Sequence, residues 1–458
     1  MGSYKAKFVK NAKKLAANSK KAVRKHLNAD ALIKMVRKDF QEVPDHRAQN
    51  AKISIDDTLM SALAMFQLKD PSLLAFDERR RKEPENLHNI HGITNIPCDS
   101  QMRSTLDPLD PQAFRASFRS AFRQLQRGKA LEKMTCLDGH YLLSGDGTSF
   151  YSSIKVTSDG CMSKKLNNGT ILHHQQMYAA SFVHYDRREV IPVFPEMITK
   201  KDGSKKNDCE RNAARRFFEE FRREHPHLKV IVVEDGLSSN GPHIKDLQRL
   251  DLRFILGAKP GDHQFLFDQV DLAVSRGEGT EFRRSDPDDP TVEHCFRFIN
   301  KVPLNKSNQD LLVNFIEYWQ IDKDGKIKSF SWVTDLTITD DNVYEIMRAG
   351  RARWKIENET FNTLKNQGYN LGHNYGLGKK NLSSVFTILM MLAFLLDQIQ
   401  QMSCWLFQQA RAEVRSKGQL WELVRGYFNS YRVDSMETIY RAIAHGHEHP
   451  SLKEFLLE

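Results

Sequence analysis

The spacing of hydrophobic residues changes about a third of the way along the chain. Up to about residue 135 these residues recur every three or four positions, which predicts a helical region. From there to about residue 250 the apolar runs are short, as in strands. The predicted strands are 141–144, 150–156, 176–184, 189–194 and 230–233. The pattern therefore predicts a helical part followed by a sheet.

One of these runs, Val230–Val233, is fully apolar and β-branched. Such a run is typical of a strand that is buried on both faces in the middle of a sheet. An amphipathic helix is predicted just before it, over 208–224, and a hairpin is predicted before that helix, over 176–194. A hairpin followed by a helical crossover to a buried strand predicts an α/β fold, with a mixed sheet and helices on both faces.

Further along the chain, residues 251–338 contain short strands and polar loops and form a β-rich segment. Asp340 and Asp341 then open a predicted helix that runs to Lys365. The apolar run 385–396 is too short to cross a bilayer, which needs roughly 20 residues, and is expected to be a buried helix. The predicted segments are 1–40, 41–135, 136–250, 251–338, 339–400 and 401–458, the last of them helical.

Composition narrows the class of protein. With 458 residues, 40% hydrophobic and 28% charged, the chain is typical of a globular protein with more than one domain. Its six cysteines are scattered, and no two of them form a Cys-x-x-Cys pair, so neither a zinc ribbon nor a disulfide scaffold is indicated. A reducing cytoplasm is the expected location.

Positive charge is concentrated at the N-terminus. Residues 1–40 carry twelve Lys and Arg against two Asp, a surplus equal to the net charge of +10 of the whole chain. A basic arm of this kind indicates a polyanionic partner, usually nucleic acid. The alternative interpretation is a lysine-rich tail that is only solvated.

A second basic feature lies in the helix predicted over 113–126. There Arg115, Arg119 and Arg123 recur every four residues beside a stripe of phenylalanines. Residues four apart share one helix face. The phenylalanines are therefore expected in the core, and the arginines either face solvent or bind DNA through its phosphates.

Three carboxylates are candidates for chemistry. Asp146 lies in the first strand, before Gly147 and Thr148, Asp235 follows the buried strand, and Glu357 lies on the helix after the β-rich segment. Carboxylates at the edge of an α/β sheet are ligands that Mg²⁺ prefers. Two such ions can activate an attacking oxygen and stabilise a leaving one in phosphate chemistry.

The residues around these acids form distinct motifs. They read Gly145-Asp146-Gly147-Thr148, Glu234-Asp235-Gly236-Leu237-Ser238-Ser239-Asn240 and Arg353-Trp354-Lys355-Ile356-Glu357, accompanied by Asn207-Asp208-Cys209-Glu210-Arg211 and Gly257-Ala258-Lys259-Pro260-Gly261-Asp262-His263. In these motifs the chain resembles the IS4-type DDE transposases, whose catalytic domain has an RNase H-like fold. The likeness covers about residues 45 to 400, most of the chain.

The resemblance implies a function and a site. Asp146, Asp235 and Glu357 would hold two Mg²⁺ ions, or Mn²⁺ in their place, and Arg353 and Lys365 would hold phosphates near the scissile bond. The enzyme would bind the ends of an insertion sequence, cut the double-stranded DNA there and join the freed 3′-OH to target DNA. A homodimer is the expected active form, in the bacterial cytoplasm at the nucleoid and away from any membrane.

The same resemblance implies the roles of the segments. Residues 41–135 would bind DNA, 136–250 and 339–400 would form the catalytic domain, and 251–338 would be an insertion within it. Two alternative functions share the fold: a catalytically inactive DNA-binding protein derived from a transposase, and a structure-selective nuclease.

Two positions depart from the family pattern. Gly350 stands where the family has Tyr, and Leu364 stands where it usually has Lys, one residue before Lys365. This shift of one residue leaves Glu359 as an alternative to Glu357 for the catalytic acid.

Two further residues near these motifs are given structural roles. Glu210 is expected only to favour the dipole at the start of its helix. Trp354 is expected in the core.

Overall fold

The computed structural model describes residues 26–198, 209–286, 289–321 and 324–446. They fall into two compact units: unit 1 holds the described residues up to Lys133, Val156–Gly160 and those from Thr363 onward, and unit 2 holds Met134–Lys155 and Cys161–Asn362. The first 25 residues of the basic arm, and Asn207 and Asp208, lie outside the described residues.

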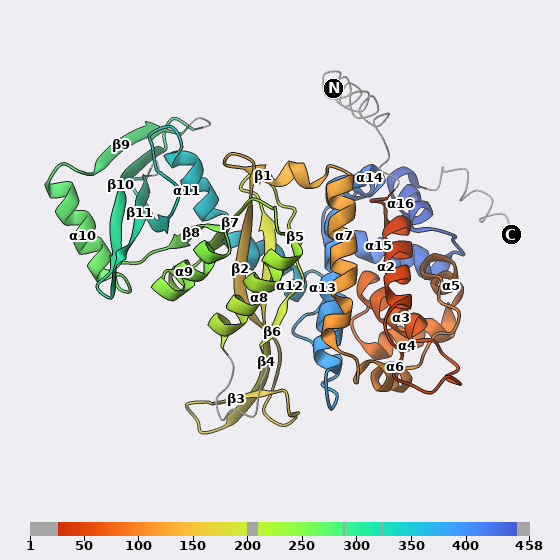
Figure 1. The fold of residues 1–458 in the computed structure, drawn as a ribbon. Helices are drawn as coiled ribbons and strands as arrows, with labels where there is room; N and C mark the ends of the chain where they lie inside the picture. The colour runs from red at the N-terminus through yellow and green to blue at the C-terminus, as the bar shows by residue number, and fades with distance from the viewer. Residues whose placement is uncertain (1–25, 199–208, 287–288, 322–323, 447–458) are drawn as a thin grey trace, which may run out of the picture. The chain divides into compact units, whose positions relative to one another are not determined.

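Within the described residues, twelve strands form one mixed sheet, and all of them belong to unit 2. β2 (His140–Ser153) has β4 (Ile171–Val183) antiparallel on one side and β7 (Val230–Glu234) parallel on the other. β8 (Arg253–Gly257) continues the parallel part beyond β7. α8 (Glu210–Glu224) lies in the connection that leads to β7 (Figure 1). The predicted mixed α/β sheet is confirmed.

Helical segments cover both faces of this part of the sheet. Successive side chains of a strand point to opposite faces, so the contacts of β4 identify what lies on each face. Tyr178 of β4 contacts Phe217 of α8, with ring centroids 5.2 Å apart. Ser181 points to the other face, where its hydroxyl lies 3.1 Å from the hydroxyl of Thr360. Thr360 belongs to η4 (Ile356–Phe361), a π-helical segment.

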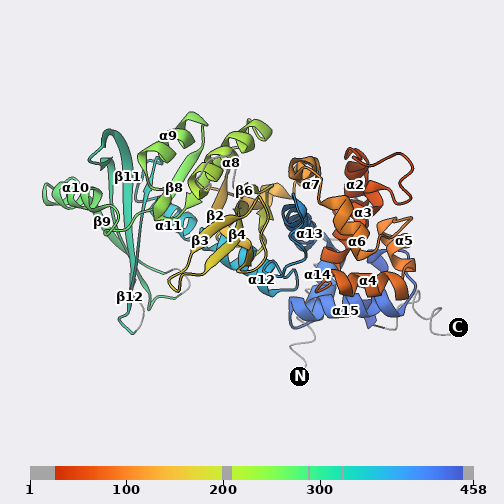
Figure 2. The ribbon, with the colours of Figure 1, turned by 90° about the horizontal axis from the view of Figure 1, so that it is seen from below.

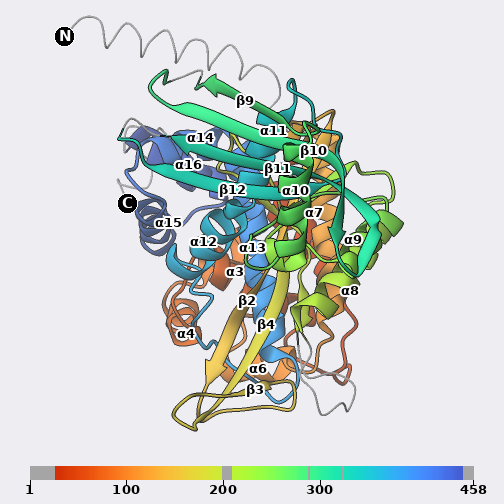
Figure 3. The same cartoon turned by 90° about the vertical axis from the view of Figure 1, so that its left-hand side faces the viewer.

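An antiparallel extension continues the sheet beyond β8. Its strands are β9 (Thr280–Ser285), β10 (Glu293–Asn305), β11 (Asn308–Ile321) and β12 (Ile327–Thr334). Figure 3 shows the four strands side by side, in the order β12-β11-β10-β9. β12 joins the extension to β8, and α10 (Gln264–Ser275) packs on β10. The β-rich character predicted for 251–338 is therefore present.

The smaller elements of unit 2 complete the sheet and its cover. They are β1 (Thr135–Cys136), β3 (Met162–Lys165), β5 (Ile191–Pro192), β6 (Glu196–Ile198), α9 (Gly241–Arg249) and α11 (Val343–Arg351). β1 pairs with β2, and β3, β5 and β6 pair with β4. α11 lies against β7, β8 and β11 and leads to η4.

Unit 1 is helical. Its helices are α2 (Ala29–Gln41), α3 (Ile55–Gln67), α4 (Leu73–Lys82), α5 (Glu85–His91), α6 (Asp99–Leu106), α7 (Arg115–Arg127), α12 (Asn362–Asn366), α13 (Leu382–Ser403), α14 (Trp405–Ala412), α15 (Lys417–Ser430) and α16 (Met436–His445). α12 begins at Asn362, the last residue of unit 2. α13 contacts α2, α3, α6, α7 and α14 (Figure 2). It is the central helix of this unit.

α13 is the one helix among the described residues that is long and apolar enough to cross a membrane. Its apolar window is completely buried within the protein, as in the core helix of a globular domain. The predicted buried helix is confirmed, but its predicted length was too short. The helix continues to Ser403, and its polar residues Asp397, Gln398 and Gln400 are also buried, with Asp397 paired with Lys69.

The second half of the predicted basic arm is a helix of the core. α2 begins at Ala29, with Asn28 as its N-cap, and buries Leu32, Val36 and Phe40 completely. Residues 29–41 are therefore folded into unit 1 and are not part of an arm. The nine Lys and Arg residues of the segment 1–25 have no acidic neighbours within it.

Candidate functional site

Asp146 and Asp235 come together because β2 and β7 are parallel neighbours. The register pairs Ser144 with Val233, and continuing it by two residues places Asp146 beside Asp235. Asp235 directly follows β7, where its side chain accepts a hydrogen bond of 3.0 Å from the backbone N–H of Leu237. This bond holds the carboxylate at the end of the strand.

The glycines on both sides of Asp146 are required by close packing. A Cβ atom on Gly145 would lie 1.9 Å from the hydroxyl oxygen of Tyr178. A Cβ atom on Gly147 would lie 2.3 Å from a carboxylate oxygen of Glu210. Both separations are far below a van der Waals contact. The Gly-Asp-Gly motif therefore lets two side chains approach the strand on the face opposite to Asp146.

Glu357 approaches Asp146 from the helical segment that covers the face of the sheet to which Asp146 points. Ser144 Oγ donates a hydrogen bond of 3.0 Å to the backbone oxygen of Arg353, which anchors the start of this segment to β2. Arg353 Nη1 donates a bond of 2.8 Å to Glu357 Oε1 and lies 3.9 Å from Asp146 Oδ2. One guanidinium therefore lies between two of the candidate acids. π-Helical segments such as η4 are frequent at functional sites.

Glu357 and Glu359 interact with different partners. Glu357 acts electrostatically on Asp146, whereas Glu359 acts on Lys355. The Lys355 ammonium donates a hydrogen bond of 2.5 Å to the backbone oxygen of Arg187, and its burial lowers its pKa against the opposing effect of Glu359. The structure therefore brings Glu357 to Asp146 and places Glu359 beside a lysine.

The electrostatics of Asp146 reflect this crowding of acids. Burial, followed by the negative charges of Asp235 and Glu357, raises the pKa of Asp146 to about 6. The backbone N–H of Gly147 and the charge of Arg353 oppose the shift. Strongly shifted carboxylates of this kind are common at functional sites.

Glu210 is a fourth acid of the site that the sequence interpretation missed. Burial, followed by the charges of Asp146, Asp235 and Glu234, raises the pKa of Glu210 to about 7. Its carboxylate also accepts a hydrogen bond from the backbone N–H of Gly147. The segment 207–211 is one of the motifs in which the chain resembles the transposase family. This membership was the signal that could have assigned Glu210 to the site. We instead expected this acid only to favour a helix start.

The donor atoms at this site are of the kind that a hard divalent cation prefers. Asp146, Asp235, Glu357 and Glu210 offer carboxylate oxygens. Burial and then the repulsion between these acids raise the pKa values of Asp146 and Glu210, and a bound cation would relieve the repulsion. Within the described ranges, no three His, Cys, Asp or Glu side chains are placed to hold one metal ion together. The chemistry of the donor set fits Mg²⁺, while Arg353 is the group that neutralises Glu357.

A buried hydrogen-bond network surrounds Glu234, the residue before Asp235. Glu234 is only 3% exposed and accepts hydrogen bonds at both carboxylate oxygens. Tyr178 donates to Oε1, and His243 Nε2 donates to Oε2 at 2.6 Å. Burial by itself would lower the pKa of His243, but the Glu234 carboxylate outweighs burial and the net shift is upward. The network fixes β4, β7 and α9 around the residue before Asp235.

The structure overturns the expectation for Trp354. Its side chain is 48% exposed, and the Arg353 guanidinium lies over its ring, 4.9 Å from the centroid. A partly exposed indole beside the acids is a surface on which a base or a cation can stack.

The remaining predicted residues lie in unit 1. Lys365 is an exposed residue of α12, and Leu364 before it is completely buried. Arg119 and Arg123 are exposed on α7, and Arg115 donates to the side chain of Gln112. The phenylalanines of α7 are buried, as predicted.

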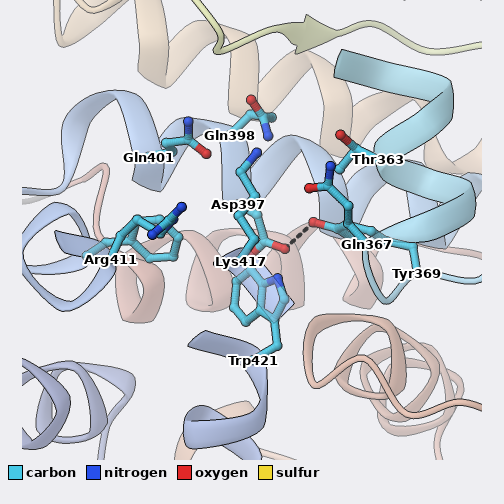
Figure 4. A pocket seen from close by; sticks show the side chains of 10 residues that line it. Thr363, Gln367, Tyr369, Asp397, Gln398, Gln401, Arg411, Lys417 and Trp421 are labelled. Atoms are coloured by element: carbon cyan, nitrogen blue, oxygen red, sulfur yellow. Dashed lines mark hydrogen bonds between the residues drawn. The ribbon is translucent and has the colours of Figure 1, made fainter. Parts of the chain in front are cut away.

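Unit 1 also contains a buried polar cluster. Lys69 Nζ donates to Asp397 Oδ2 at 2.6 Å. The Tyr369 hydroxyl donates to the same oxygen at 2.5 Å, the bond drawn in Figure 4. The ammonium lies 4.1 Å from the ring centroids of both Tyr369 and Trp421. The adjoining cavity measures about 10 Å³, room for one water at most. We interpret this cluster as part of the helical core.

Comparison with known proteins adds no assignment. A scan against models of protein families finds no match to the chain, and no curated protein matches it.

Proposed function

We propose that this protein is a DNA transposase of an insertion sequence, of the IS4-type DDE kind, and that unit 2 is an RNase H-like catalytic unit. The observation that carries the proposal is the meeting of Asp146, Asp235 and Glu357 at one edge of the sheet. They come from two neighbouring parallel strands and from a helical segment that covers the sheet. The antiparallel β4, the parallel β7 and β8, and the helix between them support the fold assignment.

The proposed cofactor is Mg²⁺, with two ions held by Asp146, Asp235 and Glu357, and Mn²⁺ as a substitute. Bound metal would supply activation of the attacking oxygen and stabilisation of the leaving oxygen. Asp146 must lose its proton before it can bind a cation, and its raised pKa of about 6 places this step just below neutral pH. Arg353 lies beside Asp146 and Glu357, and its proposed role is to neutralise a phosphate oxygen there.

The proposed reaction has two steps at the element end. Water attacks the phosphorus atom, the bond to the 3′ oxygen breaks, and a free 3′-OH and a 5′-phosphate result. The 3′ oxygen then attacks a phosphodiester of the target DNA and displaces the 3′ oxygen there. The attacking water or 3′-OH gives its proton to solvent, and the displaced 3′ oxygen takes one from solvent. A homodimer is proposed for the active complex, because an element has two ends.

The test uses the full-length protein, Mg²⁺, a supercoiled target plasmid and a duplex that carries the inverted repeat flanking the gene. We expect cleavage at the repeat end and joining of the duplex to the plasmid. Binding without cleavage would support the inactive DNA-binding alternative. Cleavage without joining, and without preference for the repeat, would support the nuclease alternative.

A further inference from the structure

Unit 2 has an open cavity of about 470 Å³ whose lining is rich in positive charge. Four cationic side chains line it: Lys328 of β12, Arg348 and Arg351 of α11, and Lys355, the residue before η4. We call this cavity the basic cleft. Its volume lies in the range of about 300–1,000 Å³ that is usual for ligand sites.

Aromatic rings hold the two guanidinium groups of the cleft in place. Arg348 lies over the ring of Tyr185, 4.2 Å from its centroid. Arg351 lies over the ring of Phe330, 5.2 Å from its centroid. A guanidinium that is already oriented loses little entropy when it binds a phosphate, and its planar donors match two phosphate oxygens.

One acid, Asp286, lines the cleft and a second, Asp186, pairs with a lining arginine; both have partners of their own. Asp286 accepts a hydrogen bond of 2.7 Å from His294 Nε2, and Asp186 pairs with Arg348. Neither Arg351 nor Lys328 forms an ion pair with any residue that the structure describes. The cleft therefore has two cations whose charge is not neutralised by a described acid.

The cleft and the candidate acids share one stretch of chain. Arg351 and Lys355 line the cleft, while Arg353 and Glu357 face Asp146. Residues two apart on a helical segment point to different sides, so the cleft and the acids lie on different sides of this segment within one unit.

We propose that the basic cleft binds consecutive phosphates of a DNA strand, on the other side of this helical segment from the acids. This inference rests on the proposed function and adds a site to it. Lys328 and Arg351 neutralise the phosphates, and Arg348 and Lys355 complete the positive lining. A free nucleotide or pyrophosphate shares the phosphate chemistry and is the other source that the test must separate.

The test measures DNA binding by the full chain without Mg²⁺, by fluorescence anisotropy over a salt series. The variants are Arg351→Gln and Lys328→Gln, with Arg276→Gln as the matched control. Arg276 is an exposed residue that ends α10, outside the cleft. Each cleft variant should weaken binding about tenfold and lower the slope of log affinity against log salt by about 0.9. The control should match the wild type, and all variants should unfold at the wild-type temperature.

Lys328 is an exposed strand residue, so its replacement keeps the test valid if Arg351→Gln fails to fold. Cleft variants that bind DNA like Arg276→Gln would overturn the inference. The second arm titrates pyrophosphate and deoxyadenosine monophosphate. If the variants lose affinity for these two compounds but keep their affinity for DNA, the cleft binds a free phosphate compound and the inference is also overturned. If the cleft variants show the predicted losses of DNA affinity but the wild type never cuts DNA, only the proposed function is contradicted.

Discussion

The hydroxyl of Ser144 donates a hydrogen bond of 3.0 Å to the backbone oxygen of Arg353, 209 residues further along the chain. Ser144 is completely buried and lies two residues before Asp146, and Arg353 lies four residues before Glu357. This single bond therefore links the strand of one candidate acid to the helical segment of another. It sets the geometry in which the two carboxylates meet.

The first prediction concerns this bond. Ser144→Ala leaves a buried carbonyl group without its donor, which costs about 1–3 kcal/mol. We expect DNA cleavage to slow by about 10- to 100-fold, because Glu357 moves relative to Asp146, while DNA affinity stays unchanged. Single-turnover cleavage and anisotropy measure the two effects. Ser275→Ala is the control, since Ser275 also donates to a backbone oxygen but lies exposed on α10. Equal cleavage rates for both variants would show that this bond does not position Glu357 for cleavage.

The second prediction separates the two glutamates of η4. Glu357→Gln removes a charge that acts on Asp146, so we expect cleavage to fall by about a thousandfold, equivalent to about 4 kcal/mol. Glu359→Gln changes the surroundings of Lys355 and should slow cleavage less than tenfold. Cleavage assays with both proteins at one Mg²⁺ concentration decide the matter. The reverse order of effects would make Glu359 the catalytic acid.

The third prediction is a pH dependence of stability. The pKa of Asp146 rises to about 6 and that of Glu210 to about 7 in the folded protein, above the ordinary 3.8 and 4.5. The folded state therefore binds more protons than the unfolded state between about pH 4 and 7. The contribution of these groups to the free energy of unfolding falls as the pH rises through that window. Mg²⁺ binds the ionised carboxylates, so it should stabilise the protein at pH 8 and much less at pH 5.

Thermal unfolding with and without Mg²⁺ measures this effect, and Glu210→Gln isolates the contribution of Glu210. The variant loses one of the shifted acids, so its metal-free stability should fall less than that of the wild type between pH 5 and 8. Glu220→Gln, on the same helix but paired with Arg223, is the control and should follow the wild type. The explanation is contradicted if Glu210→Gln and the wild type show the same pH dependence.

The fourth prediction concerns the buried cluster of unit 1. Lys69→Met leaves Asp397 buried without its cation and should lower the free energy of unfolding by about 3–5 kcal/mol. The double variant Lys69→Met, Asp397→Leu removes both charges and should recover most of that loss. Urea denaturation compares the three proteins. A double variant that is no more stable than the single one would show that packing, and not charge pairing, dominates at this position.

Local patterns predicted much of the fold. The β-branched run at 230–233 is β7, buried throughout, because a strand covered on both faces needs apolar side chains at every position. The spacing of Leu32, Val36 and Phe40 also carried the signal for α2, but the density of lysine around it led us to extend the basic arm to residue 40. Charge counts describe composition, whereas the apolar spacing decides whether a segment packs.

The errors at the site come from contacts between distant residues. The helix predicted from Asp340 to Lys365 is broken, with α11 ending at Arg351 and a π-helical segment beginning at Ile356. Bonds from Ser144 and Ser181 to this segment are tertiary and leave no periodic signal in the sequence. Glu210 and Trp354 were assigned from local rules alone. Their places beside Gly147 and Arg353 depend on how the strands and helices pack.

The most direct test of the central claim compares Mg²⁺-dependent cleavage of an end-bearing duplex by the wild type, Asp146→Asn and Asp235→Asn. Both replacements keep the side-chain size and remove a carboxylate charge. We predict Mg²⁺-dependent cleavage by the wild type and a cleavage rate lower by at least about a thousandfold in both variants. Without metal, both variants should keep the DNA affinity and the unfolding temperature of the wild type. Wild-type cleavage rates in either folded variant would contradict the claim that these two aspartates form the metal-dependent site.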